Sequence, residues 1–219
     1  MLCTYGKYAW FQNRLNDHYL LKSRADSYRS RAAYKLEELD QKYKLIKPGA
    51  KILDLGAAPG SWSQYALRKT NGKAKIIAID LLDIEPIENV TIIKGDIRDP
   101  ENQKKILELA PNGLDLIMSD MAPDTTGVHY ADTENSFLLV SLALDIAEKL
   151  LKPKGNFVAK VFEGAEYNDL LRRTRSMFDF AKSCNPKASL NRSRELFMVA
   201  QGYKGKFEKA KNEPLENNS

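Results

Sequence analysis

A lysine lies inside one of the most apolar runs of the sequence. Lys160 belongs to the run GNFVAKVF (155 to 162), which has the length and composition of a strand buried on both faces. Burying an ammonium group is costly unless the group is paired or neutralised, so a carboxylate partner is expected nearby. Asp120, which ends the run GLDLIMSD, can supply that charge. The alternative is an edge strand from which Lys160 reaches water.

Two further charged residues can join this pair. Lys35 lies on the side of a predicted helix that also carries Ala32, Leu36 and Leu39, and Glu195 opens the last predicted strand. Two lysines and two carboxylates balance in charge and can therefore share a buried site. Such a group would titrate as a coupled unit.

The stretch DLGAAPGSW, residues 54 to 62, predicts a turn that holds a small molecule. Gly56 and Gly60 allow close approach of the backbone, and Pro59 suits the first turn of a following helix. The glycine spacing matches neither the dinucleotide fingerprint nor the phosphate-binding loop. Phosphate is therefore not the expected ligand.

Acidic residues end the next two predicted strands. Asp80 can accept both hydroxyls of a ribose, Asp96 can receive an adenine amino group, and Trp62 can wall the pocket. Each acid taken alone is more often a turn former, but their recurrence at successive strand ends favours a binding role. A nucleoside without pyrophosphate fits best, and S-adenosylmethionine is such a molecule.

The elements that must position these residues alternate along the chain. Short apolar runs at 50–56, 73–80, 89–96, 113–120, 155–162 and 194–203 predict strands, with helical patterns between the first five of them. This alternation predicts a doubly wound α/β domain with a mostly parallel sheet over residues 45–205. Residues 9–44 predict helix, so residues 1–44 form a helical, basic extension, and residues 206–219 predict a disordered tail.

Charge and composition narrow the classes of function. Residues 1 to 47 hold 10 of the 34 basic and 5 of the 29 acidic residues, which leaves 24 of each in the rest of the chain. This excess, with a second basic cluster between Arg172 and Arg194, predicts a polyanion-binding face, although a solvated surface remains the alternative. The sequence has no membrane span, signal segment, disulfide framework or metal-ligand spacing, which predicts a cytoplasmic protein without a metal.

Seven motifs in order resemble one family. SRAAYKLEEL, DLGAAPGSWSQY, IDLL, GDIRD, SDMAP, FVAKVFEG and SREL are similar to the FtsJ (RrmJ) family of ribosomal RNA 2′-O-methyltransferases over residues 9 to 205. Ser61 stands where bacterial members commonly have a second glycine, and Asp124 where asparagine is frequent. The resemblance implies a seven-stranded sheet, S-adenosylmethionine as cofactor and large-subunit ribosomal RNA as partner.

The resemblance also implies roles for individual residues. The tetrad carries over to Lys35, Asp120, Lys160 and Glu195, with Lys160 as the base, Asp120 orienting it, and Glu195 holding Lys35 or the substrate ribose. The implied donor contacts are Gly56, Ala57, Pro59, Gly60, Trp62, Asp80, Asp96, Ile97 and Asp120. The expected RNA contacts are Arg14, Lys22, Arg24, Arg29, Arg31 and Arg194.

Other functions stay open from the sequence. A related 2′-O-methyltransferase could act on transfer RNA or a messenger cap, and an inactive RNA-binding assembly factor could use the same scaffold. A small-molecule methyltransferase would leave the basic N-terminus and the paired lysines unexplained. A dehydrogenase is disfavoured by the glycine spacing. We expect an active monomer that methylates a uridine ribose in the assembled large subunit.

Overall fold

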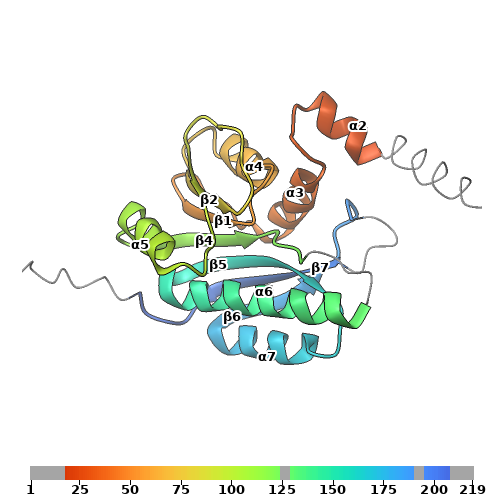
Figure 1. Cartoon of the computed structure of the whole chain (residues 1–219), viewed down its shortest axis with the longest axis vertical. Helices are drawn as coiled ribbons and strands as arrows, with labels where there is room; N and C mark the ends of the chain where they lie inside the picture. Colours follow the sequence, from red (N-terminus) through yellow and green to blue (C-terminus); the bar gives the residue numbers. More distant parts are fainter. Residues whose placement is uncertain (1–17, 124–128, 190–194, 208–219) are drawn as a thin grey trace, which may run out of the picture.

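Seven strands form one twisted sheet at the centre of the molecule (Figure 1). This computed structural model describes residues 18–123, 129–189 and 195–207. The strand order is β3-β2-β1-β4-β5-β7-β6, in which β1 to β5 run parallel and β7 pairs antiparallel with β5 and β6. The strands are β1 (Lys51–Leu55), β2 (Lys75–Asp80), β3 (Val90–Lys94), β4 (Leu114–Ser119), β5 (Leu151–Phe162), β6 (Phe178–Cys184) and β7 (Glu195–Tyr203). The predicted α/β class is confirmed.

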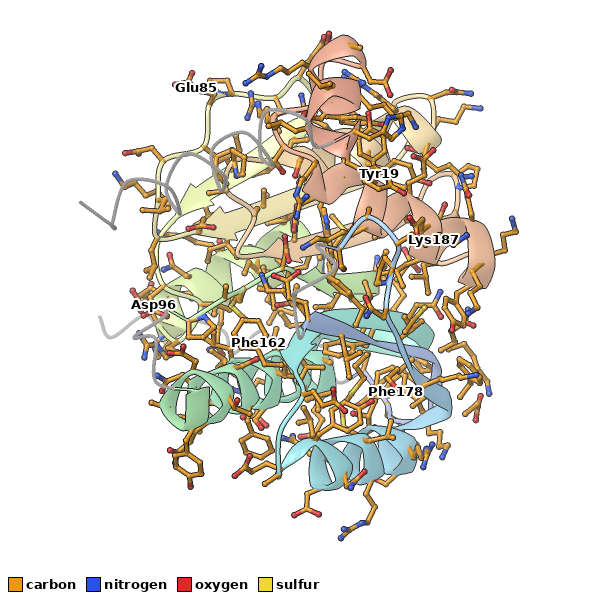
Figure 2. All side chains as sticks on the ribbon, turned by 90° about the vertical axis from the view of Figure 1, so that its right-hand side faces the viewer. Tyr19, Glu85, Asp96, Phe162, Phe178 and Lys187 are labelled. Atoms are coloured by element: carbon orange, nitrogen blue, oxygen red, sulfur yellow. The ribbon has the colours of Figure 1, made fainter. Side chains whose placement is uncertain are left out.

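Helices cover both faces of this sheet. Residues of α5, α6 and α7 join one core cluster, and residues of α3 and α4 join another on the opposite face. Figure 2 shows Phe178 of the first cluster between the sheet and α7. The helices are α2 (His18–Ala25), α3 (Ala32–Tyr43), α4 (Ser61–Lys69), α5 (Pro100–Leu109), α6 (His129–Leu150) and α7 (Tyr167–Met177).

The alternation of side chains along β5 decides where its lysine points. Phe157, Ala159 and Val161 pack into the cluster of α5, α6 and α7, whereas Val158 packs into the opposite cluster. Because alternate residues of a strand share a face, Lys160 lies on the side of α3 and α4. β5 is flanked by β4 and β7, so the predicted central position of Lys160 is confirmed and the edge-strand alternative is wrong.

Two element predictions need correction. The single helix expected over 9–44 is broken, because Ser27 adopts φ of 54° and residues 26–31 form a connector between α2 and α3. β6 was absent from the predicted strands, because its exposed and half-buried residues interrupt the apolar run. Of the tail expected from residue 206, Phe207 is described and is half-buried beside Gly113, whereas residues 208–219 lie outside the described part. Among the residues that the structure describes, no helix is long and apolar enough to cross a membrane.

Candidate active site

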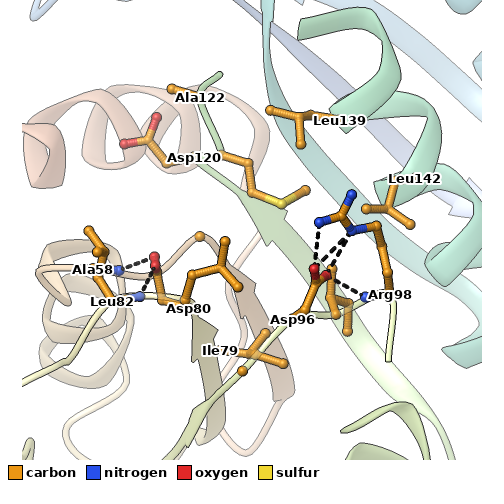
Figure 3. A pocket seen from close by; sticks show the side chains of 15 residues that line it. Ala58, Ile79, Asp80, Leu82, Asp96, Arg98, Asp120, Ala122, Leu139 and Leu142 are labelled. Carbon is orange, nitrogen blue, oxygen red and sulfur yellow. Dashed lines mark hydrogen bonds and ion pairs between the residues drawn. The ribbon is translucent and has the colours of Figure 1, made fainter. Parts of the chain in front are cut away.

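A cavity of about 360 Å³ opens at the carboxyl ends of the parallel strands (Figure 3). In an open α/β sheet, ligands bind at this edge, near the point where the strand order reverses. The volume lies in the range of small-ligand pockets. The lining residues come from the ends of β1 to β4 and from α6: Gly56, Ala58, Ile79, Asp80, Leu81, Leu82, Gly95, Asp96, Ile97, Arg98, Asp120, Met121, Ala122, Leu139 and Leu142.

The turn after β1 brings backbone, rather than side chains, to the cavity. Gly56 has φ of +67°, and a Cβ added there would lie 2.6 Å from Cγ and 2.9 Å from Cα of Met121. Only a residue without Cβ fits this approach without displacing its neighbour. The backbone at Gly56 therefore approaches the segment that follows β4 closely, and its contact with a bound small molecule stays a prediction.

Asp80 ties two loops together at the end of β2. Its Oδ2 accepts a hydrogen bond from the Ala58 amide and its Oδ1 accepts one from the Leu82 amide, each at 2.9 Å (Figure 3). A carboxylate has about four lone-pair sites, so each oxygen retains one acceptor position. The carboxylate can thus hold both loops and still accept two ligand hydroxyls.

Asp96 is engaged by Arg98 in this structure. The Arg98 amide and Nε donate to Oδ1 at 2.8 and 3.0 Å, while Nε and Nη2 donate to Oδ2 at 2.9 and 2.6 Å (Figure 3). These hydrogen bonds lower the pKa of Asp96, with burial acting in the opposite direction. Since the acceptor sites of the carboxylate are filled, an adenine amino group can bind Asp96 only after the Arg98 side chain shifts.

Lys160 and Asp120 meet at the edge of the cavity, as the sequence predicts. The Lys160 side chain is 7% exposed, and its Nζ lies 2.9 Å from Asp120 Oδ1 and donates to the main-chain oxygen of Asp120 at 2.7 Å. Asp120 Oδ1 is buried, and the ion pair with Lys160 offsets its charge. This carboxylate lines the cavity, so it can pair with Lys160 and face a cationic ligand at the same time.

Lys35 and Glu195 form a second pair on the same face of the sheet. Lys35 Nζ lies 2.6 Å from Glu195 Oε2 and 5.6 Å from the centre of the Phe197 ring. The register pairs Phe197 with Lys160, and Glu195 lies two residues before Phe197 on β7. α3, β4, β5 and β7 therefore bring all four predicted tetrad residues into two neighbouring ion pairs.

Several predicted donor contacts lie behind the cavity instead. Ala57, Pro59 and Gly60 shape the loop but do not line the cavity, and Pro59 precedes α4 rather than occupying its first turn. Trp62 is only 2% exposed, and its Nε1 donates to the Ala32 carbonyl at 2.8 Å while its ring packs near Phe197. Trp62 thus anchors α3 to α4, and the prediction that its side chain walls the pocket is wrong for this structure.

Sequence reasoning missed part of the lining. Arg98 follows Asp96 by two residues, so a basic neighbour of a predicted binding acid was visible in the sequence. Leu139 and Leu142 come from α6, and nothing local indicates that this helix reaches the cavity. No group of three or more His, Cys, Asp or Glu side chains within the described ranges is arranged to hold a metal ion.

The predicted RNA-binding residues divide into three groups. Lys22 and Arg24 are exposed on α2, and Arg31 is half-buried next to α3. Arg29 is different, because its guanidinium donates to main-chain oxygens of Pro59, Glu85 and Pro86, a role that the sequence did not predict. Arg14 and Arg194 lie outside the described residues.

Internal packing explains part of the predicted polyanion face. Arg172 pairs with Asp169 and Arg173 with Asp145, so the second basic cluster is partly neutralised. Tyr19 and Tyr28 pack against Tyr34 at centroid distances of 5.6 and 5.7 Å. These two tyrosines therefore serve helix packing.

A protein of known structure shares the fold over most of the chain. A crystal structure from Plasmodium falciparum, named as a ribosomal RNA methyltransferase, superposes with a TM-score of 0.74 at 35% identity, covering 82% of this chain and 100% of the other. The fold and the cavity thus define an α/β methyltransferase.

Sequence comparison is more specific. The profile of the FtsJ-like methyltransferases matches residues 28–203, and the chain belongs to that family. "Ribosomal RNA large subunit methyltransferase E" of Pseudomonas fluorescens (strain Pf0-1) is 44% identical over 91% of this chain and 96% of its own length. The protein of the same name from Legionella pneumophila (strain Corby) is 43% identical over 89% and 95%.

Proposed function

We propose that this protein transfers a methyl group from S-adenosylmethionine to a ribose 2′-hydroxyl of large-subunit ribosomal RNA. The observation that carries the proposal is the Lys160–Asp120 pair at the edge of a nucleoside-sized cavity, with the Lys35–Glu195 pair beside it. Family membership supports the methyltransferase chemistry. The names of the relatives support the substrate class, and a uridine target follows only from the resemblance of the motifs.

The cavity has the groups that this donor needs. Asp80 offers two acceptor positions for ribose hydroxyls, and Ile97, Leu139 and Leu142 offer apolar surface for a base. The buried Asp120 carboxylate suits the positive charge of a sulfonium or ammonium group. When bound, S-adenosylmethionine supplies an electrophilic methyl group.

Lys160 is the proposed base. Its Nζ is held by both the carboxylate and the main-chain oxygen of Asp120, so the position of the nitrogen is fixed before substrate binds. Removal of the 2′-hydroxyl proton requires the neutral amine of Lys160. Asp120 therefore orients Lys160, and Glu195 holds Lys35 toward the substrate side.

The RNA would approach over α2, α3 and the tetrad. Lys22 and Arg24 are exposed on α2 and can contact phosphates. One chain contributes all four tetrad residues, so we propose that the protein acts as a monomer. We also propose that it acts without a metal and in the cytoplasm. Whether the assembled subunit is required is an outcome of the experiment below.

Transfer of labelled methyl groups tests the proposal. Undermethylated large subunits, free ribosomal RNA and transfer RNA are each offered with labelled S-adenosylmethionine, and nuclease digestion locates the label on ribose or base. We expect ribose label on large-subunit RNA. Label confined to transfer RNA, to a cap or to a base would contradict the proposal, as would donor binding without any transfer, which would indicate an RNA-binding assembly factor.

A further inference from the structure

The connector between α2 and α3 lies against the loops that form the donor side of the cavity. The loop that carries Glu85 lies at the same end of the molecule as these two helices in both views (Figures 1 and 2). Arg29, in the middle of the connector, donates from Nη1 to the oxygens of Pro59 at 2.9 Å and Glu85 at 2.7 Å. Its Nη2 donates to the Pro86 oxygen at 2.9 Å. One guanidinium therefore joins the connector to the loop after β1 and to the loop after β2.

The acceptors belong to two loops that meet at Asp80. Pro59 directly follows Ala58, whose amide binds Asp80, and Glu85 and Pro86 lie in the loop that begins with Leu81 and Leu82. Ala58, Leu81 and Leu82 line the cavity. Arg29 thus holds the outer sides of both loops, while Asp80 holds their inner sides.

The packing at Gly60 shows how closely these parts fit. A Cβ added to Gly60 would lie 2.7 Å from Cδ1 of Ile87 and 3.0 Å from Nη1 of Arg29. Gly60 has φ of +103°, which L side chains rarely adopt. The loop after β1 is consequently shaped to accept both the guanidinium and the loop after β2.

Neighbouring residues of the connector add bonds to the same region. The Arg29 amide donates to Oε1 of Gln64 at 2.9 Å, and the hydroxyls of Ser30 and Ser61 lie 2.8 Å apart. Ser61 is the first residue of α4. In this chain its hydroxyl gives the connector a further contact with the start of α4.

We propose that Arg29 is a positioning residue that fixes the two donor-side loops, and not a phosphate contact for RNA. The inference rests on the proposed donor site. A guanidinium presents five donors in a planar fork, whereas an ammonium is a point charge on a flexible stem. Lysine at position 29 would keep the positive charge but could not bridge both loops with the same geometry.

The test measures donor binding and RNA binding separately in matched arginine variants. Arg29→Met and Arg29→Lys are compared with Arg68→Met, which removes bonds from Arg68 to the oxygens of Asp26 and Ser27 at 2.6 and 3.1 Å. Arg68 holds the same connector to α4 but touches neither donor loop. Arg24→Met is the reference for loss of an exposed positive charge from α2.

We expect Arg29→Met to raise the dissociation constant of S-adenosylmethionine, measured by calorimetry, at least tenfold, and Arg29→Lys at least fivefold. The turnover rate at saturating donor should stay within about threefold of the wild type, and RNA affinity and its salt dependence should stay unchanged. Arg68→Met should bind donor like the wild type even when urea unfolding shows a similar loss of stability. Arg24→Met should weaken RNA binding and leave donor binding intact.

Three results would overturn the inference: wild-type donor affinity in Arg29→Met, full recovery in Arg29→Lys, or equal weakening in Arg68→Met. The lysine variant keeps the test valid if Arg29→Met does not fold. A wild-type protein that binds no S-adenosylmethionine would instead refute the proposed donor site, so the two failures are distinguishable.

Discussion

At the scale of single residues, Asp54 is an acid in an unusually dry position. Its side chain is fully buried in β1, Oδ2 accepts a hydrogen bond from the Ser63 hydroxyl at 2.7 Å, and Oδ1 accepts none from the described residues. Burial raises the pKa of Asp54 to about 7; Ser63 lowers it, and the charges of Asp120 and Asp80 raise it further. The carboxyl is therefore partly protonated near neutral pH.

This carboxyl predicts a specific dependence of stability on pH. Because the folded-state pKa lies above the unfolded value, the native state binds the extra proton, and stability falls as pH rises from about 4 to about 7. A shift of roughly 3 pH units corresponds to about 4 kcal/mol. We expect Asp54→Asn to gain stability relative to the wild type over this range, as measured by urea unfolding at several pH values. A constant difference between the two proteins from pH 4 to 8 would contradict the prediction.

The charged residues of the candidate active site could be predicted from the sequence for a simple reason. A lysine in an apolar run and acids at strand ends conflict with burial, and such conflicts are visible without a structure. The partners of Arg29 and Trp62 were hidden, because main-chain oxygens exist at every residue and leave no trace in the sequence. Their roles depend on which segments the fold brings together.

At the scale of elements, the glycines on either side of α4 are of two kinds: Gly56 lies in the turn before this helix and Gly72 in the turn after it. Gly56 and Gly72 both have positive φ, of +67° and +75°. A Cβ at Gly72 meets nothing within 4 Å, whereas one at Gly56 meets the side chain and backbone of Met121. The pair therefore separates the cost of backbone conformation from the cost of a clash.

We expect Gly72→Ala to lose about 1 kcal/mol of unfolding free energy from the left-handed conformation alone. Gly56→Ala should lose about 2 kcal/mol more from the clash, and should also weaken donor binding, because Gly56 and Met121 line the cavity. Urea unfolding and calorimetry measure the two effects. Similar losses in both variants would mean that the contact with Met121 is not tight.

The strands were predictable where their sequences are short runs rich in apolar and β-branched residues, which includes β3 at one edge of the sheet. β1, β2, β4 and the second half of β5 are nearly continuous apolar runs. β6 is an edge strand with several exposed residues, so its sequence lacks that pattern. The break after α2 was hidden because residues 9–44 contain neither glycine nor proline, although Ser27 takes a left-handed conformation there.

At the scale of the whole molecule, the proposed RNA path crosses α2, which carries exposed basic side chains. Arg24 is exposed on this helix, whereas Arg172 on α7 is paired with Asp169 at 2.6 Å. We expect Arg24→Ala to weaken RNA binding and to reduce the slope of log affinity against log salt by about 0.7 to 0.9. Arg172→Ala is the matched control and should leave the slope unchanged. Filter binding between about 50 and 200 mM salt measures this slope. Equal slopes in the wild type, Arg24→Ala and Arg172→Ala would contradict the prediction.

The central claim is that Lys160 removes the proton from the ribose hydroxyl. Its matched control is Lys152, which lies near the start of β5, whereas Lys160 lies near its end. The Lys152 Nζ pairs with Asp115 at 2.8 Å and with no member of the tetrad. The most direct measurement is single-turnover methyl transfer to undermethylated large subunits by Lys160→Met and Lys152→Met, with donor binding measured in parallel. We predict that Lys160→Met binds S-adenosylmethionine nearly as the wild type does and transfers no methyl group, while Lys152→Met is active. A Lys160→Met rate above about a tenth of the wild-type rate, a barrier change below about 1.4 kcal/mol, would contradict the account.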